Sequence, residues 1–326
     1  MNRWRAAAQR TRLISGWSAA LILMLELIFF TILLAPRNGG PHTFANAANF
    51  ALILKYSSIY GIGAIAAAMI IGAGGIDLAP GAVIALASVV TGHLFVIEQW
   101  SLWRACCAGL FTGFASGTLA ATLVIAARLP SFIATLGVMG ITRGAAFLIT
   151  EGRFYDLSSR LPAATAPLGI ALSAWPGLVM LAFAVIFHVV MVHTAIGRHI
   201  LAVGGNEQAA RYAGVRVARV KAFVYVGGGV LAALSGVVIA VVQGQGKADL
   251  ANGYELDIIA AAVVGGASLS GGRASVVGAV IGSLIFGVLR NALTQIPGGT
   301  FADRLILGIA VLVIVVMDRI ATRKPA

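Results

Sequence analysis

Residues 222–242 read AFVYVGGGVLAALSGVVIAVV, a run of twenty-one residues without one charged side chain. An α-helix rises about 1.5 Å per residue, so this run is long enough to cross the roughly 30 Å hydrocarbon core of a bilayer. A surface helix of a soluble protein would carry a charged or polar face, which this run lacks. It therefore predicts a membrane-spanning helix.

The whole composition agrees with this interpretation. The 326 residues are 60% apolar and only 10% charged, with a mean hydropathy of +0.96, whereas soluble domains carry about 25% charged residues. A soluble globular enzyme and a disordered chain are both excluded. Apolar segments recur along the whole chain, which predicts an all-α polytopic membrane protein of about ten transmembrane helices, forming a single domain over residues 1–326. The segments are 17–35, 51–71, 82–97, 105–127, 132–150, 177–192, 222–242, 256–267, 276–293 and 305–317.

The net charge of +12 is distributed as expected for a membrane protein rather than for a nucleic-acid-binding protein. Basic residues collect in cytoplasmic loops and set the orientation of the chain. With an even number of spans and both termini cytoplasmic, fourteen basic residues lie inside and six outside. The fourteen are Arg3, Arg5, Arg10, Arg12, Arg128, Arg198, Arg211, Arg216, Arg219, Lys221, Arg273, Arg319, Arg323 and Lys324.

Two glycine-rich stretches interrupt the apolar pattern. Residues 72–81 read GAGGIDLAPG and residues 264–273 read VGGASLSGGR, and neither can form a continuous helix. Non-helical backbone at membrane depth needs protein or water to satisfy its polar groups. Paired interruptions can mark a transport pathway, and a structural turn at the cytoplasmic ends of the helices is the alternative. The residues of this broken-helix motif are Gly74, Gly75, Asp77, Gly265, Gly266, Gly271 and Gly272, of which we expect Asp77 to cap or tie its segment.

Other glycines are spaced by four residues inside the apolar segments, namely Gly109, Gly113 and Gly117, and again Gly278 and Gly282. Small residues at this spacing let two helix backbones approach closely in lipid. The spacing favours helix packing within the chain, and a dimer interface is the alternative.

One loop, at about residues 196–221, is long and basic. Asn206 can cap a short helix whose first turn carries Glu207 and which ends with Arg211 before Gly214. A short helix held between two spans is suited to docking a cytoplasmic partner. The alternative is that the arginines of this loop bind anionic lipid headgroups at the membrane surface.

Ionisable residues inside spans are costly, so they are candidates for function. They are Glu26, Lys55, Arg143, Glu255, Asp257 and Arg290, of which Lys55 and Arg290 are as well explained by reaching the membrane interface. The five histidines contain no pair spaced by four residues, so we expect no metal site.

Several of these motifs, in this order, resemble the permease subunits of bacterial ABC importers of the ribose, xylose and galactose type. They are GGIDL at 74–78, LPSFIATLG at 129–137 with Arg143 and Gly144, the segment 197–214, the segment 255–273, and Asn291. The resemblance covers nearly the whole chain. It implies a multi-pass protein of the bacterial inner membrane that moves a monosaccharide into the cytoplasm by alternating access.

The resemblance also implies partners. The chain has no phosphate-binding loop of the form GxxxxGK[ST], so ATP and magnesium belong to a separate cytoplasmic ATPase, and this chain is neither an enzyme nor the holder of a cofactor. A periplasmic sugar-binding protein and a second permease copy or a paralogue complete the implied assembly. The segment that would couple to the ATPase comprises Gly204, Gly205, Asn206, Glu207, Ala209, Ala210, Arg211 and Gly214.

A neutral sugar needs hydroxyl, amide and aromatic groups along its path. The candidates are Asn49, Phe132, Thr135, Thr142 and Asn291. Other cargoes stay open, namely a nucleoside, a branched-chain amino acid or a furanosyl signalling molecule. A secondary transporter driven by an ion gradient is the alternative of another class, although it should show a relay of buried carboxylates or histidines.

Overall fold

The structure, a computed structural model, describes residues 19–36, 43–161 and 175–299, with a few residues between 301 and 312. Within them the regular secondary structure is helical apart from two short antiparallel strands, β1 (Phe154–Asp156) and β2 (Gln245–Lys247). The helices are Ala19–Leu33, α2 (Ala47–Gly72), α3 (Pro80–Val96), α4 (Leu102–Ile125), α5 (Ser131–Thr150), α6 (Trp175–His193), α7 (Ala195–Gly205), α8 (Glu207–Tyr212), α9 (Val217–Gln243), α10 (Tyr254–Val264) and α11 (Val276–Thr294).

Six of these helices are long and apolar enough to cross a membrane, namely α2, α4, α5, α6, α9 and α11. The prediction of an all-α polytopic membrane protein is therefore confirmed. Helix α10, in the predicted eighth span, has only eleven residues, a length of about 16 Å that is roughly half of the bilayer core. The predicted tenth span, 305–317, and both termini lie almost wholly outside the described residues, so the count of ten helices and the cytoplasmic termini stay predictions.

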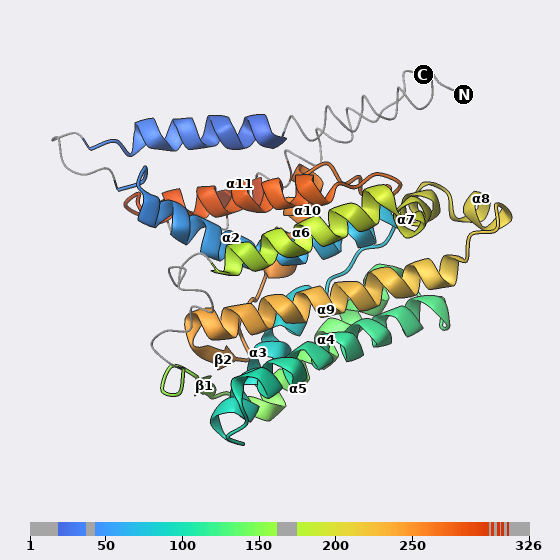
Figure 1. The fold of residues 1–326 in the computed structure, drawn as a ribbon, viewed down its shortest axis with the longest axis horizontal. Coiled ribbons are helices and arrows are strands. Elements are labelled where there is room, and N and C mark those ends of the chain that lie inside the picture. The colour runs from blue at the N-terminus through green and yellow to red at the C-terminus, as the bar shows by residue number, and fades with distance from the viewer. Residues whose placement is uncertain are drawn as a thin grey trace.

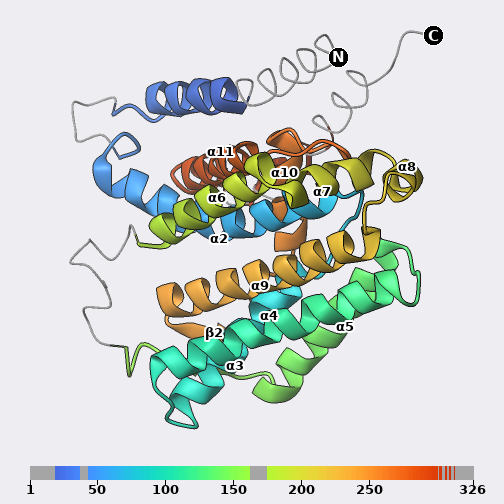
Figure 2. The same cartoon turned by 45° about the vertical axis from the view of Figure 1, so that its right-hand side comes forward.

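The long helices run side by side in two layers (Figures 1 and 2). One layer holds α2, α6, α10 and α11, and the other holds α3, α4, α5 and α9, with α2 packed on α9 between them. Helices α7 and α8 lie at one end of this bundle, and β1 and β2 lie at the opposite end. The two ends of the bundle are therefore built from different elements, and they would face opposite sides of a membrane.

Small residues allow the two layers and their helices to pack closely. A side chain on Gly113 would overlap the carbonyl oxygen of Gly229, so α4 packs directly on the backbone of α9. Gly278 packs in the same way on Gly265, and this contact joins α11 to α10. The prediction that the regularly spaced glycines pack helices within the chain is confirmed.

Both predicted interruptions are present. Helix α2 ends at Gly72 and α3 begins at Pro80, and eleven residues separate the end of α10 at Val264 from the start of α11 at Val276. The predicted loop at 196–221 differs from the structure, because most of it is helical. The side chain of Thr194 caps α7 by accepting a hydrogen bond from the amide of Gly197, and α9 begins at Val217, five residues before the apolar run. The first turn of α9 contains basic residues, so a prediction from hydropathy alone did not include this turn in the helix.

Candidate functional site

The two interruptions meet α7 at a contact made by backbone alone. The amide of Gly272 donates a hydrogen bond to the carbonyl oxygen of Gly72 at 3.1 Å. A side-chain carbon on Gly271 would lie 2.5 Å from the carbonyl oxygen of Gly204 and 3.0 Å from the Cα of Gly74. We call these five residues the glycine junction. Because a side chain on Gly204 or Gly271 would overlap the backbone of a neighbouring segment, α7 packs directly on both interruptions.

The remaining glycines of the broken-helix motif have other surroundings. Gly75 lies against the ring of Tyr225, and Gly265 lies against α11 through Gly278. Gly266 has a φ of +95°, which lets the chain turn after α10. The structure thus brings Gly74, Gly271 and Gly272 to the junction and leaves the other three glycines in turns and helix packing.

Helix α8 forms as the sequence predicts. The side chain of Asn206 accepts a hydrogen bond from the amide of Ala209 at 2.9 Å and caps the helix, and Gly214 leaves it with a φ of +84°. Ala210 is the one buried residue of α8, whereas Tyr212 is 90% exposed. The helix therefore presents most of its surface outward, at the end of the bundle.

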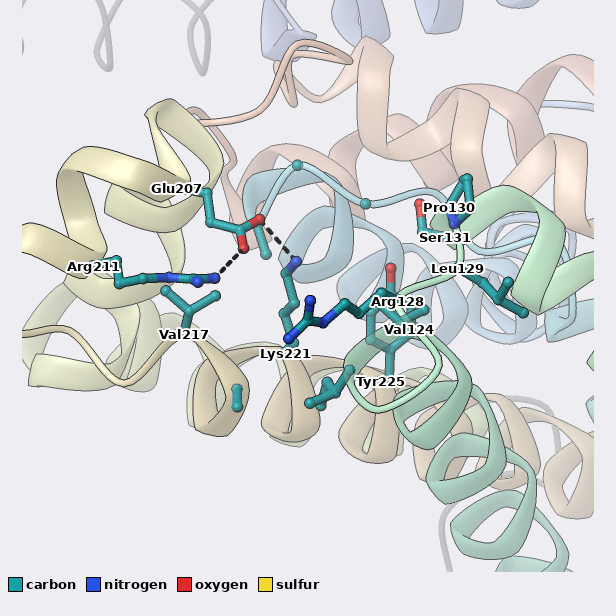
Figure 3. Close-up of a pocket in the computed structure, with 15 residues that line it drawn as sticks. Val124, Arg128, Leu129, Pro130, Ser131, Glu207, Arg211, Val217, Lys221 and Tyr225 are labelled. Atoms are coloured by element: carbon teal, nitrogen blue, oxygen red, sulfur yellow. Dashed lines mark hydrogen bonds and ion pairs between the residues drawn. The ribbon is translucent and has the colours of Figure 1, made fainter.

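Glu207 binds α8 to the bundle (Figure 3). Its carboxylate accepts hydrogen bonds from Lys221 of α9 at 2.8 Å and from Arg211 of its own helix at 3.0 Å. The hydrogen bond from Lys221 holds the pKa of the Glu207 carboxyl below its ordinary value, with partial burial opposing and Arg211 assisting. Two independent contacts, the glycine junction and this ion pair, thus connect the predicted coupling segment to the membrane helices.

The extended chain between α2 and α3 is held by side chains of α5. The amide of Ile76 donates to the hydroxyl of Ser131 at 3.1 Å, and the amide of Leu78 donates to the hydroxyl of Thr135 at 3.0 Å. Asp77 accepts a hydrogen bond from the amide of Ala79 at 2.8 Å, which ties the segment as expected. Thr135, a predicted path residue, therefore has a supporting contact: it satisfies backbone that would otherwise be unpaired at membrane depth.

The other predicted path residues do not form one site. Asn49 and Asn291 exchange two hydrogen bonds, at 2.9 and 2.8 Å, which join α2 to α11. Thr142 is buried and donates to the carbonyl of Val138 in its own helix at 2.8 Å. Phe132 is half exposed on the outer face of α5. The structure thus brings the two asparagines together and leaves the three residues of α5 apart from them.

Three of the charged residues of the spans, Asp257, Arg290 and Arg143, have partners that hydropathy did not reveal, whereas Glu26 and Glu255 each have a buried carboxylate oxygen without a partner in the described part of the chain. Asp257 and Arg290 form an ion pair at 2.9 Å, in which Arg290 also stacks on Tyr60 with its guanidinium 4.9 Å from the ring centre. Arg143 donates to the carbonyl oxygens of Ala248 and Leu250 at 2.7 and 2.8 Å, at the chain that leads into α10. The sequence contained an indication of this ion pair, because a buried charge in an apolar segment is costly unless an opposite charge from a neighbouring segment pairs with it. No pattern pointed to Tyr60, and Ser131 was part of the motif at 129–137 without a role assigned to it.

Comparison with known proteins identifies the family. Residues 49–316 match the model of a family described as a branched-chain amino acid transport system permease component. The chain belongs to this permease family. The permease is 34% identical to the ribose import permease RbsC of Escherichia coli K12 over 92% of both chains. It is also 34% identical to RbsC of Bacillus subtilis over 85% of this chain and 86% of the relative.

A third relative is the L-arabinose transport system permease protein AraH of Escherichia coli K12. It is 32% identical over 85% of this chain and 83% of the relative. No solved structure matches the permease. Together with the six membrane-span-capable helices, the family makes this permease a multi-pass transport protein of the bacterial inner membrane.

Proposed function

We propose that this permease is the membrane subunit of an ATP-driven importer that carries a monosaccharide into the cytoplasm by alternating access. The observation that carries the proposal is the similarity, over most of the chain, to permeases named for ribose and L-arabinose. In this assignment the α8 end of the bundle faces the cytoplasm and the β1–β2 end faces the periplasm, with both termini inside and about ten transmembrane helices.

The proposed assembly has three kinds of subunit contact. A cytoplasmic ATPase, which carries ATP and magnesium, docks on α8. A periplasmic sugar-binding protein delivers the cargo at the opposite end, and a second permease copy or a paralogue lies beside this one in the membrane. Closure of the ATPase pair would displace α8, and the glycine junction would pass that displacement to both helix interruptions.

Co-purification tests the ATPase contact. The tagged permease is solubilised from its native membrane and its partners are identified by mass spectrometry, with residues 206–210 intact or replaced by a Gly/Ser sequence. The control replaces the exposed turn 97–101, at the opposite end of the bundle. We expect an ATPase to be recovered with the intact chain and the control, and to be lost from the 206–210 variant. Recovery of no ATPase with the folded intact chain would favour a gradient-driven transporter instead.

Uptake tests the cargo. The family description names branched-chain amino acids, which makes leucine the second candidate. Cells that lack this permease gene and cells that carry it again are given radiolabelled ribose, arabinose or leucine. We expect uptake of a pentose to return with the gene while uptake of leucine is unchanged. Return of leucine uptake alone would overturn the monosaccharide assignment.

A further inference from the structure

A cavity of about 600 Å³ opens beside α8, at the proposed cytoplasmic end of the permease (Figure 3). Four elements form its wall: α8, the first turn of α9, the chain that joins α4 to α5, and the turn after α2 at Gly74 and Gly75. The cavity therefore borders both the predicted coupling segment and one of the two helix interruptions.

The charge of this cavity is unbalanced. Three basic side chains line it, Arg128, Arg211 and Lys221, against one acidic side chain among the lining residues, Glu207. That carboxylate already accepts hydrogen bonds from both Lys221 and Arg211. Arg128 has no hydrogen bond or ion pair with the described part of the chain, although its side chain extends toward Lys221 and Glu207 in Figure 3. The lining side chains thus carry two more positive than negative charges, and neighbouring like charges repel each other unless an anion lies between them.

The backbone adds to the positive potential. Pro130 and Ser131 at the start of α5, and Val217 and Ala218 at the start of α9, all line the cavity. Neither helix has a side-chain cap or an acidic residue in its first turn. The N-terminal ends of long helices carry partial positive charge and stabilise anions.

The position of Arg128 is itself unusual. Its φ is +55°, in the left-handed region that non-glycine residues adopt only at a cost of about 1 kcal/mol or more. A glycine or asparagine would fit this turn with less strain. The exposed Arg128 lines the cavity without a partner in the described part of the chain, and guanidinium groups bind phosphate with two parallel hydrogen bonds.

We propose that this cavity binds a phosphate group, held by Arg128 and Lys221 against the first turns of α5 and α9. Its volume accommodates a phosphorylated pentose as well as the headgroup of an anionic lipid. Because the bound anion would bridge α9, the α4–α5 connection and the turn at Gly74, its presence stabilises the arrangement of α8 seen here. The inference concerns binding to this chain alone and does not depend on the cargo or on the ATPase.

A binding measurement with two probes tests it. The purified permease is placed in nanodiscs of phosphatidylcholine and titrated with inorganic phosphate or ribose 5-phosphate, at constant ionic strength set with chloride. We expect saturable binding that weakens about 10- to 100-fold in Arg128→Gln, the loss typical of one charge-assisted contact. Arg219→Gln is the matched control. Arg219 is an exposed arginine in the first turn of α9, close in sequence to the residues of α9 that line the cavity, but it does not line the cavity itself.

A second arm distinguishes a lipid from a soluble anion. The permease is moved to nanodiscs that contain phosphatidylglycerol, and native mass spectrometry counts the retained lipids. Retention by the intact chain and Arg219→Gln, but not by Arg128→Gln, assigns the site to a lipid headgroup. Binding of ribose 5-phosphate with no such retention assigns it to a soluble phosphate ester. Equal behaviour of the intact chain and Arg128→Gln toward every probe, or an equal loss in Arg219→Gln, overturns the proposal.

Discussion

Gly72 and Gly272 are joined by a backbone hydrogen bond of 3.1 Å, although they end α2 and precede α11 in opposite halves of the chain. Gly204, the penultimate residue of α7, packs against both of them. At this hydrogen bond the backbones of three segments, those of Gly72, Gly204 and Gly272, lie so close together that a side chain on Gly204 would overlap the other two. Such a contact is rigid and sensitive to volume, since a packed interior yields little to an added carbon.

Replacement of Gly204 by alanine tests this contact. A methyl group there would overlap the carbonyl oxygen of Gly72 and lie 2.7 Å from the amide nitrogen of Gly272. We expect the free energy of unfolding to fall by about 1–3 kcal/mol, the usual cost of overpacking. Thermal unfolding of the purified permease in detergent measures it.

Gly227→Ala is the control for that substitution. Gly227 is also helical, and a methyl group on it would meet no atom within 4 Å. Alanine is the better helix former by about 1 kcal/mol, so this variant should be as stable as the original or more so. Equal unfolding temperatures for the two variants would show that the glycine junction is not tightly packed.

The contact of Thr135 with the extended chain can be tested in the same way. Thr135→Val keeps the shape of the side chain and leaves the amide of Leu78 without its 3.0 Å partner, which should cost about 1–3 kcal/mol for a buried unpaired donor. Thr135→Ser keeps the hydroxyl and should recover most of the loss. Hydrogen exchange of residues 76–79 reports the opening of this segment directly.

Thr118→Val provides the comparison. Thr118 is exposed on α4, and its hydroxyl donates only to the carbonyl of Phe114 in its own helix. Its replacement should change stability by less than about 0.5 kcal/mol. If Thr118→Val and Thr135→Val had the same effect, Thr135 would not be supporting the extended chain.

The ion pair between Asp257 and Arg290 should be important to the fold. The two side chains are only 13% and 25% exposed and lie 2.9 Å apart. Asp257→Asn removes the charge of the carboxylate from this pair, and loss of one member of a buried pair costs about 3–5 kcal/mol. Asp249→Asn, which breaks the half-exposed pair of Lys247 and Asp249, should cost at most about 1 kcal/mol. Denaturation of the three proteins side by side gives the comparison, and similar losses would contradict it.

The sequence predicts the helices well because lipid imposes a simple rule on them. A run such as 222–242 has no other stable state in a membrane, so its helix is visible in composition alone. The two interruptions were equally visible, because four glycines and a proline within 72–81 cannot continue a helix. The helix α8 was predicted from its cap, which is a local signal of the same kind.

What the sequence could not reveal is how distant segments meet. Gly74 and Gly272 were each predicted to lie in a turn, but nothing in either motif says that both turns touch Gly204. Helix α10 lies at the predicted eighth segment, 256–267, which was already among the shortest of the ten, and the structure gives it eleven residues. The sequence did not reveal that Gly265, which ends this helix, packs on the backbone of Gly278 in α11, a relationship between helices rather than within one.

The attachment of α8 to the bundle should depend on pH. The Glu207 carboxyl has an ordinary pKa of 4.5, which Lys221 lowers in the folded protein. A carboxyl whose folded pKa is lowered stabilises the fold fully above its unfolded value and loses that contribution as the pH falls through the folded value. We therefore expect α8 to be held firmly at pH 7 and to loosen below about pH 4.5. A nitroxide label in place of Tyr212, which is 90% exposed, reports this as increased mobility.

Two variants separate this ion pair from a general effect of acid. Glu207→Gln cannot carry the charge, so its label should be mobile already at pH 7 and should change little on acidification. Glu98→Gln removes an exposed carboxylate in the turn between α3 and α4, at the other end of the bundle, and should follow the original protein. If the label were equally immobile in Glu207→Gln and in the original protein at pH 7, the glycine junction and Ala210 alone would hold α8, and the ion pair with Lys221 would not be needed.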